Sequence, residues 1–546
     1  MPARAIPSMV RPPGGQSVRI GLALSGSGLR AAYFQLGAIR MLEELRIMEH
    51  IEVISATGGG SLAGGYYLVE MHARLAAEPD RSRIALCDEI IEDFLTSTER
   101  GLVIGRRNRL GEPWHKFKAR LGKLQPGSAL AETIERQLFD EPLTLADLPH
   151  VNNDRDREVG PFFTVPRLLI NTTCLTDGRR MVYGRESNES LKEQIDCADR
   201  NALSLAGVMA ASAADVDAFG AVELDDSVLT DGGIADSQGM ETLLDYFELS
   251  PPEQNKLTPT LRQPENHVHA PIHLLVCDGS APSVCAATPN GLSSVVTLMQ
   301  SENRRRILGW LSDKLREPDR ESPIAGLCVV HPQIEAEPED IDGVLPRELV
   351  RALAGLRATL GPMTRCEREY LMYHGYLLLA AQMRRHNRSL LPREISLSSV
   401  TQGNFSVPPT SISVWSQEDA RGLRARARML DHMRLGARTS GRTWSRHRGM
   451  VLPFVVIAAL IARGLTHAMF TTIVDQSVFS GVMSWVRRAT MTTRGSTADQ
   501  LFSVGFTALF LCAIVLAGFW LYDRFKYILR FEQRAEDASV RRAVRN

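Results

Sequence analysis

The sequence predicts an α/β fold with a mainly parallel sheet. The prediction starts from residues 18–68, which read as strand, glycine loop, helix, strand, glycine loop and helix. Further short apolar runs follow at residues 167–173, 272–277 and 326–330, separated by segments with helical periodicity. Strands that alternate with helices form βαβ units, whose strands are parallel. A length of 546 residues is enough for one large domain of this kind together with further segments.

The first apolar run, residues 20–24, ends at Ser25-Gly26-Ser27-Gly28 and is followed by apolar residues at helical spacing. A glycine-rich turn that opens a helix leaves backbone N–H groups unpaired at the positive end of the helix dipole. Such groups can hold a phosphate or an oxyanion. Residues 26–31 also fit a dinucleotide fingerprint, which needs an acidic residue after the second strand. Because Thr57 and glycines stand there instead, the dinucleotide interpretation is disfavoured.

The second apolar run, residues 51–56, ends in Thr57-Gly58-Gly59-Gly60-Ser61 and leads into another helical segment. A strand that turns this sharply into a helix is the setting of a nucleophile elbow, whose pattern is G-x-S-x-G. The position of the two glycine loops after neighbouring strands therefore favours a hydrolase-like site.

Three ordered motifs, namely the glycine loop, the elbow and a later D-G-G sequence, give this chain a resemblance to the patatin-like phospholipases. Residues 26–30 (GSGLR) look like the G-G-G-x-R oxyanion loop of that family, and residues 231–233 (DGG) resemble its D-G-G motif. The remaining similar segments are the central strand and turn at 168–173 and 177–179, the small-residue helix at 210–214, and the late helix of bacterial members at 367–379. The resemblance spans roughly residues 16 to 390. It implies a three-layer sandwich and a lipid acyl hydrolase.

The resemblance also implies roles for individual residues. The family uses a Ser-Asp dyad, in which an elbow serine attacks a lipid ester and the aspartate of D-G-G, here Asp231, activates it. The oxyanion would be bound by the loop residues Gly26, Ser27, Gly28 and Arg30. In this chain Gly58 occupies the nucleophile position, and glycine has no side chain with which to form an acyl-enzyme. Catalysis is therefore expected to be impaired or lost.

Another hydroxyl group could replace the missing nucleophile. Ser27 occupies a family glycine position in the oxyanion loop, and Ser61 lies nearly one helical turn after the elbow. Thr57 precedes the apex and Ser55 lies within the strand. An active enzyme that uses Ser27 or Ser61 is the alternative to a protein without catalysis. In serine hydrolases the loss of the nucleophile costs about 10⁶-fold in turnover.

Asp231 follows the β-rich run at residues 222–229 and precedes two glycines. Its carboxylate is expected beside the elbow, although a structural role in capping its own turn is the competing interpretation. Asp236 is a weaker candidate for the base. The run Arg304-Arg305-Arg306 is interpreted as one polar face of a helix in preference to a lipid phosphate site.

The overall composition indicates no nucleic-acid partner, because 63 basic residues balance 63 acidic ones. The eight cysteines are scattered without C-x-x-C spacing, which is typical of reduced thiols in a cytosolic domain. Neither a metal-binding motif nor a cofactor is indicated. Residues 1–17 are proline-rich and lack the apolar stretch of a secretory signal, so a disordered N-terminus is expected.

Basic residues and apolar segments alternate in the C-terminal part. Arginines crowd residues 421–448 immediately before an apolar segment, which is typical of the cytoplasmic side of a membrane. Residues 501–522 contain no charge and are long enough to span a bilayer, whereas residues 449–474 are interrupted by Pro453, Arg463 and His467 and either span or lie at the interface. The expected organisation is a disordered N-terminus (1–17), a patatin-like domain (18–395), a basic juxtamembrane linker (396–448), a first membrane segment (449–474), a loop (475–500), a transmembrane helix (501–522) and a basic tail (523–546).

The sequence thus predicts a cytoplasmic patatin-like domain tethered to a membrane by a C-terminal hairpin. Its expected partner is membrane phospholipid or another acyl lipid, and its oligomeric state stays open. Two functions remain: a lipid acyl hydrolase with an unusual nucleophile, and a non-catalytic relative that binds acyl lipid or a protein. The residue that separates them is Gly58.

Overall fold

The computed structural model describes residues 18–99, 101–102, 126–149, 166–185, 200–214, 221–224, 226–250, 270–280, 291–316, 323–337, 344–391 and 420–436. All of these residues belong to one compact unit. The two predicted membrane segments, the loop between them and the basic tail lie outside the described residues, as do residues 1–17.

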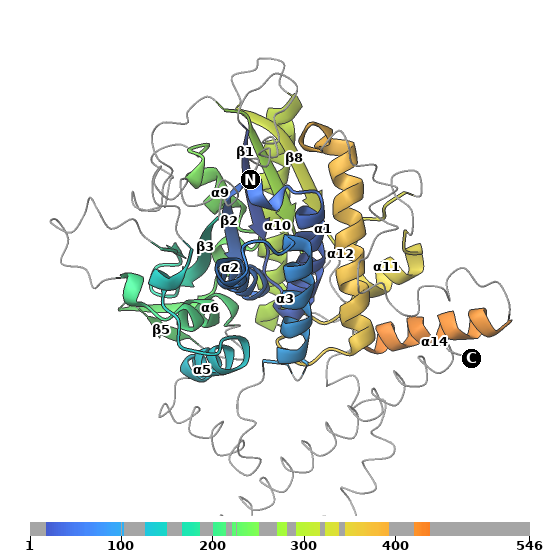
Figure 1. Ribbon diagram of the computed structural model, residues 1–546, viewed down its shortest axis with the longest axis horizontal. Helices are drawn as coiled ribbons and strands as arrows, with labels where there is room; N and C mark the ends of the chain where they lie inside the picture. The colour runs from blue at the N-terminus through green and yellow to red at the C-terminus, as the bar shows by residue number, and fades with distance from the viewer. Residues whose placement is uncertain are drawn as a thin grey trace, which may run out of the picture. The chain divides into compact units, whose positions relative to one another are not determined.

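A central sheet organises the described part of the chain (Figure 1). Its strands are β1 (Arg19–Leu24), β2 (Ile51–Thr57), β3 (Arg167–Cys174), β4 (Arg180–Tyr183), β5 (Val222–Leu224), β6 (Ser227–Asp231), β7 (Ile272–Cys277) and β8 (Ile324–Val330). Hydrogen bonds connect them in the order β5-β6-β3-β2-β1-β7-β8, and β4 pairs with β3. β1, β2, β3, β7 and β8 are parallel, whereas β4, β5 and β6 are antiparallel to their neighbours. The predicted α/β class with a central sheet is confirmed.

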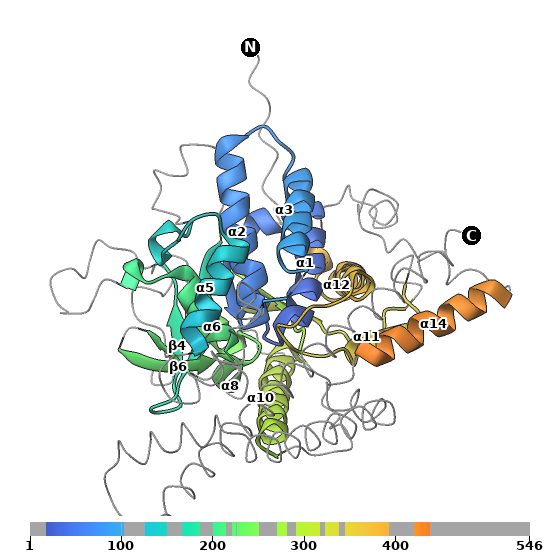
Figure 2. The same ribbon diagram turned by 90° about the horizontal axis from the view of Figure 1, so that it is seen from below.

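Helices cover both faces of the sheet (Figure 2). One face carries α1 (Gly28–Glu44), α2 (Gly59–Ala77), α3 (Arg83–Ser97), α5 (Pro126–Leu138), α6 (Leu205–Ala213) and α12 (Arg365–His386). The other face carries α8 (Gly233–Asp236) and α10 (Gly291–Arg316). It also carries α9 (Met240–Tyr246), whose buried apolar side chains belong to the same cluster as Leu311 of α10. Short 3-10 helices are η1 (Met48–His50), η2 (Leu145–Asp147), η3 (Arg200–Ala202) and η7 (Arg388–Leu390). Each face has its own buried apolar cluster, so the described domain has three layers.

The predicted late helix is present as α12, and it packs closely along α1. Two glycines permit this approach. A Cβ atom at Gly37 would lie 1.9 Å from the carbonyl oxygen of Met372, and one at Gly375 would lie 2.0 Å from the carbonyl oxygen of Phe34. Side chains at either position would push the two helices apart, which explains why the glycines are needed within otherwise regular helices.

His374 on α12 makes the stability of the fold sensitive to acid. Its Nε2 lies 3.1 Å from the carbonyl oxygen of Pro332, and burial lowers its pKa to about 4. Between about pH 6.5 and pH 4 the unfolded chain binds a proton that the folded chain excludes. The free energy of unfolding therefore falls as the pH drops through this window, by roughly 3 kcal/mol for this one group. Urea unfolding at pH 7 and pH 5 should show a smaller difference in His374→Gln than in the unmodified chain.

Part of the basic stretch that was predicted as a linker is a helix, α14 (Ala420–Gly436). Its apolar side buries Ala425, Met429 and Met433, and it contacts α11 (Arg347–Ala354). The arginines of α14 concealed this apolar spacing in the sequence. Within the residues that the structure describes, no helix combines the length and the apolar character needed to cross a membrane.

Candidate active site

The register of three strands brings the elbow and Asp231 together. Thr57, the last residue of β2, pairs with Asn171 of β3, and Asp231, the last residue of β6, pairs with Thr172. β4 pairs with residues 170–173 of β3, a stretch that overlaps both the part paired with β2 and the part paired with β6. β4 therefore occupies the opposite edge of β3. β2 and β6 therefore lie along one edge of β3 and meet end to end. This arrangement places the residue after Thr57 beside Asp231.

Gly58 has the backbone conformation of an elbow. Its φ of 52° and ψ of −116° join β2 to α2 in a turn that side-chain-bearing residues rarely adopt. A Cβ atom at this position would lie 3.8 Å from Oδ1 of Asp231, 3.6 Å from the carbonyl oxygen of Ser212 and 3.1 Å from Cα of Gly26. A serine side chain here would therefore reach the carboxylate. The backbone at Gly58 thus has the geometry of a nucleophile position, but glycine has no side chain that could act as the nucleophile.

Asp231 both caps its turn and faces the elbow. Its Oδ1 accepts a hydrogen bond of 2.8 Å from the Gly233 amide, as the capping interpretation predicts. Its backbone is fixed by two hydrogen bonds: the Asp231 amide donates to the Ala214 carbonyl (3.0 Å), and the Thr173 hydroxyl donates to the Asp231 carbonyl (2.8 Å). The two interpretations of Asp231 are compatible, because the capping bond orients the carboxylate toward Gly58.

The glycine loop of residues 26–28 packs directly against the elbow. Ser27 and Gly28 have φ values of 113° and 60°, and a Cβ atom at Gly59 would lie 2.0 Å from the carbonyl oxygen of Gly28. In the first turn of α2, Gly60 donates to the Ser25 carbonyl, and the two following amides donate to the Gly58 carbonyl. Within the described part of the chain the Gly59 amide has no acceptor, so it is available to an oxyanion, as the amide after an elbow nucleophile is in α/β-hydrolases.

Comparison with known families agrees with this geometry. Residues 22–244, which contain the glycine loop, the elbow and Asp231, match the family model described as patatin-like phospholipase. This part of the chain therefore resembles a patatin-like domain. It has the mixed α/β fold with a central sheet that the resemblance implied. No curated protein sequence matches the chain.

Several solved structures resemble the chain at low identity. VipD from Legionella pneumophila is 13% identical over 69% of this chain and 70% of its own, with a TM-score of 0.29. Human GIVD cytosolic phospholipase A2 is 12% identical over 68% of this chain and 60% of its own, with a TM-score of 0.41. The type III effector protein ExoU is 15% identical over 77% of this chain and 63% of its own, with a TM-score of 0.24. Identities and scores this low say nothing about activity.

Within the described domain Arg30 connects distant segments. Its guanidinium donates to the carbonyl oxygens of Gly279 (2.9 Å), Leu356 (2.7 Å) and Ala354 (3.4 Å), and burial lowers its pKa to about 10. The guanidinium thus holds backbone carbonyl groups of other segments, and these contacts do not support the predicted oxyanion role of Arg30. Gly26 is also engaged, because its amide donates to the Ser237 carbonyl (3.0 Å).

Two of the alternative hydroxyl groups are held by other contacts. Ser61 is fully buried and donates to the Gly58 carbonyl at 2.7 Å. Thr57 donates to the Asp236 carbonyl at 3.0 Å. A nucleophile needs its hydroxyl directed at its base. These bonds direct both hydroxyl groups elsewhere.

Ser27 differs from these residues. It is partly exposed, adjoins Gly26 in the loop that touches the elbow, and holds a φ of 113° that side-chain-bearing residues rarely adopt. Within the described residues its hydroxyl makes no hydrogen bond. Of the alternatives, Ser27 is therefore the one whose hydroxyl no other described contact directs away from the site.

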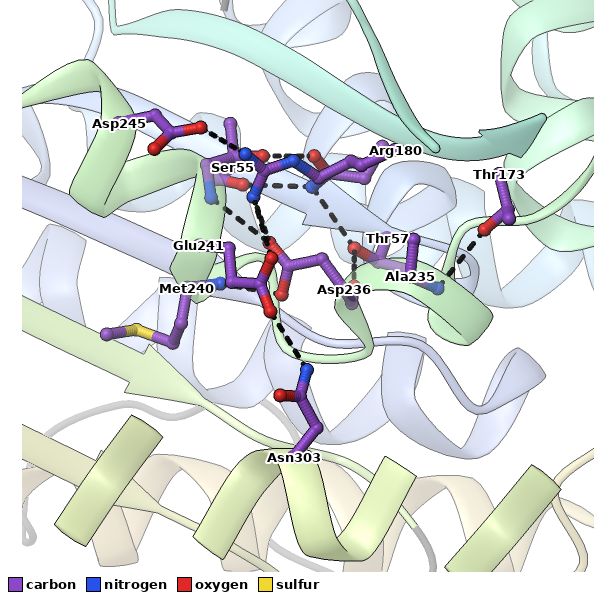
Figure 3. Close-up of polar contacts among 12 residues, drawn as sticks. Ser55, Thr57, Thr173, Arg180, Ala235, Asp236, Met240, Glu241, Asp245 and Asn303 are labelled. Atoms are coloured by element: carbon purple, nitrogen blue, oxygen red, sulfur yellow. Dashed lines mark hydrogen bonds and ion pairs between the residues drawn. The ribbon is translucent and has the colours of Figure 1, made fainter. Parts of the chain in front are cut away.

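Asp236 belongs to a buried polar network beneath the elbow (Figure 3). Its carboxylate accepts from the amides of Met240 and Thr242 (3.1 Å each) and pairs with Arg180 at 3.4 Å. Arg180 also pairs with Asp245, and burial raises the pKa of Asp236. These contacts hold α8 and α9 against β4. Asp236 is thus saturated with structural partners, which favours Asp231 as the base.

Two residues that the sequence did not single out as site residues, Ser212 and Asn171, support the elbow. The Ser212 hydroxyl accepts from the Gly58 amide at 2.8 Å and donates to the Asn171 carbonyl at 2.6 Å. The Ser212 carbonyl accepts from the Gly232 amide at 3.1 Å. Ser212 therefore connects the elbow, β3 and the D-G-G turn. Only its position within the small-residue helix segment pointed to it.

Replacing Ser212 by alanine should lower stability more than an exposed serine substitution does. The Gly58 amide would remain buried without an acceptor, which costs about 1 to 3 kcal/mol. Ser82→Ala is the matched control, because the Ser82 side chain makes no capping bond at the start of α3. Urea unfolding of both variants measures the difference, and equal midpoints would contradict the supporting role of Ser212.

Proposed function

We propose that this chain is a membrane-tethered protein of the lipid acyl hydrolase class in which the elbow site binds acyl lipid with impaired or lost hydrolysis. The observation that carries the proposal is the elbow backbone at Gly58. A Cβ atom at this position would lie 3.8 Å from Oδ1 of Asp231. The scaffold that would position a nucleophile is intact, and the nucleophile is missing. A lipid ligand is proposed because the family model is that of patatin-like phospholipases.

The proposed chemistry separates binding from bond cleavage. The Gly59 amide can donate to the carbonyl oxygen of a lipid ester, and this contact does not require a nucleophile. Asp231 can orient a water molecule, but without a covalent intermediate the oxyanion hole and binding retain roughly 10³- to 10⁴-fold over water. The ester would therefore be held and cleaved slowly.

Membrane tethering and a cytoplasmic location of the domain are parts of the same proposal. Support comes from the apolar segments 449–474 and 501–522 and from the arginines that precede the first of them. A tether would raise the local concentration of phospholipid at the site.

The test measures release of fatty acid from phosphatidylcholine vesicles by the full chain. We expect at most slow release that Ser27→Ala does not change, together with crosslinking of a photoreactive phosphatidylcholine to residues near Gly58. Turnover by the unmodified chain that disappears in Ser27→Ala would overturn the proposal in favour of the second candidate, an active hydrolase. The partly exposed Ser27, in the loop that packs against the elbow, is the observation that favours this second candidate.

A further inference from the structure

We propose that the outward face of α10 docks on an anionic phospholipid surface beside the elbow site. This inference rests on the proposed lipid ligand and does not depend on whether the ligand is hydrolysed. The docking face is defined here as Leu298, Met299, Arg305, Arg306 and Trp310, joined by Ile234 of α8.

The inward side of α10 is fixed over the site. Gln300 donates to the Gly233 carbonyl at 2.8 Å, Asn303 donates to Glu241 at 2.9 Å, and Arg304 donates to Asp278 at 3.1 Å. Leu311, two turns later on the same side, is fully buried. Gln300 contacts Gly233, two residues after Asp231, so the N-terminal half of α10 lies next to the Asp231 carboxylate. Arg304 was predicted to lie on one polar helix face together with Arg305 and Arg306. In the structure it points inward and pairs with Asp278.

The outward side of α10 leaves large apolar side chains in solvent. Met299 is 66% exposed, Leu298 is 50% exposed and Trp310 is 40% exposed. Ile234, directly after the D-G-G turn, is 39% exposed. Single exposed apolar residues are ordinary, but a group of them on one helix and beside one site indicates a binding surface.

The charges between these apolar residues favour an anionic occupant. Arg306 is exposed and has no partner within the described residues. Arg305 pairs with Glu302 at 2.6 Å, but both side chains are more than half exposed, so solvent screens this bond. Arginines beside apolar residues and a tryptophan are typical of helices that lie in a membrane interface.

The proposed geometry has a functional consequence. A membrane in contact with Met299 and Ile234 would bring acyl chains to the side of the domain where Asp231 lies. Each arginine near an anionic surface should favour the docked state by about fivefold.

The experiment places a fluorescent label on the full chain reconstituted in vesicles of phosphatidylcholine and phosphatidylglycerol. The label is attached at Met299→Cys, after Cys197, Cys285 and Cys512 have been replaced by serine. The other five cysteines are buried. The matched control carries the label at Glu92→Cys, an exposed position of α3 on the opposite side of the sheet. Lipids with a nitroxide on the acyl chain serve as quenchers.

We expect strong quenching at position 299 and little at position 92. The double variant Arg305→Gln with Arg306→Gln should lower the ratio of docked to undocked domain about 25-fold. The double variant Arg81→Gln with Arg136→Gln should leave this ratio unchanged. Equal quenching at the two labels, or emission at position 299 that responds to protein density and not to nitroxide lipid, would overturn the proposal. Hydrolysis is not measured, so failure of docking and failure of the proposed function are distinguishable.

Discussion

Gly58→Ser is expected to convert this chain into a measurable ester hydrolase. The new hydroxyl would be attached to a Cβ atom 3.8 Å from Oδ1 of Asp231, within reach of a hydrogen bond to that carboxylate. A nucleophile accounts for about 10⁶-fold in turnover in serine hydrolases, so recovery of even a thousandth of that effect gives about 10³-fold. Hydrolysis of a p-nitrophenyl acyl ester by the full chain measures the gain.

The substitution carries a conformational cost that the measurement must separate from activity. A serine at a φ of 52° is strained by about 1 to 3 kcal/mol, and its Cβ would lie 3.1 Å from Cα of Gly26. Gly178→Ser is the matched control, because Gly178 also has a positive φ of 72° and has open space around it. Unchanged hydrolysis in a folded Gly58→Ser protein would show that the site lacks more than its nucleophile.

Asp231→Asn is expected to remove most of the activity that Gly58→Ser gains. A general base contributes about 10²- to 10⁴-fold, and asparagine cannot accept the proton of the serine. The asparagine Oδ1 can still accept from the Gly233 amide, so the turn should remain intact. Turnover of Gly58→Ser with and without Asp231→Asn measures the loss, and Asp177→Asn in the same background is the control for an exposed aspartate. Equal turnover with and without Asp231→Asn would point to another base.

The parts of the site that sequence predicted are the ones that depend on local chain geometry. Turns that need a positive φ select glycine, so the glycine loop and the elbow could be found from residues 26–28 and 57–60. Asp231 could be found because it ends a strand before two glycines. These features come from neighbouring residues, which is why the sequence was sufficient for them.

The parts that sequence did not predict depend on contacts between distant segments. Ser212 meets Gly58 across 154 positions of the chain, and Arg30 meets Leu356 across 326. The predicted single strand at residues 222–229 is divided into β5 and β6 by a turn at Asp226, which has a φ of 54°. A positive φ at a non-glycine residue has no clear mark in the sequence.

The most direct test of the central claim is covalent labelling of the full chain by a fluorophosphonate, with the modified peptide identified by mass spectrometry. The account predicts no labelled serine in the unmodified chain, a labelled residue 58 in Gly58→Ser, and loss of that label when Asp231→Asn is added. A labelled serine in the unmodified chain, at Ser27 or elsewhere, would contradict the claim that this site has lost its nucleophile.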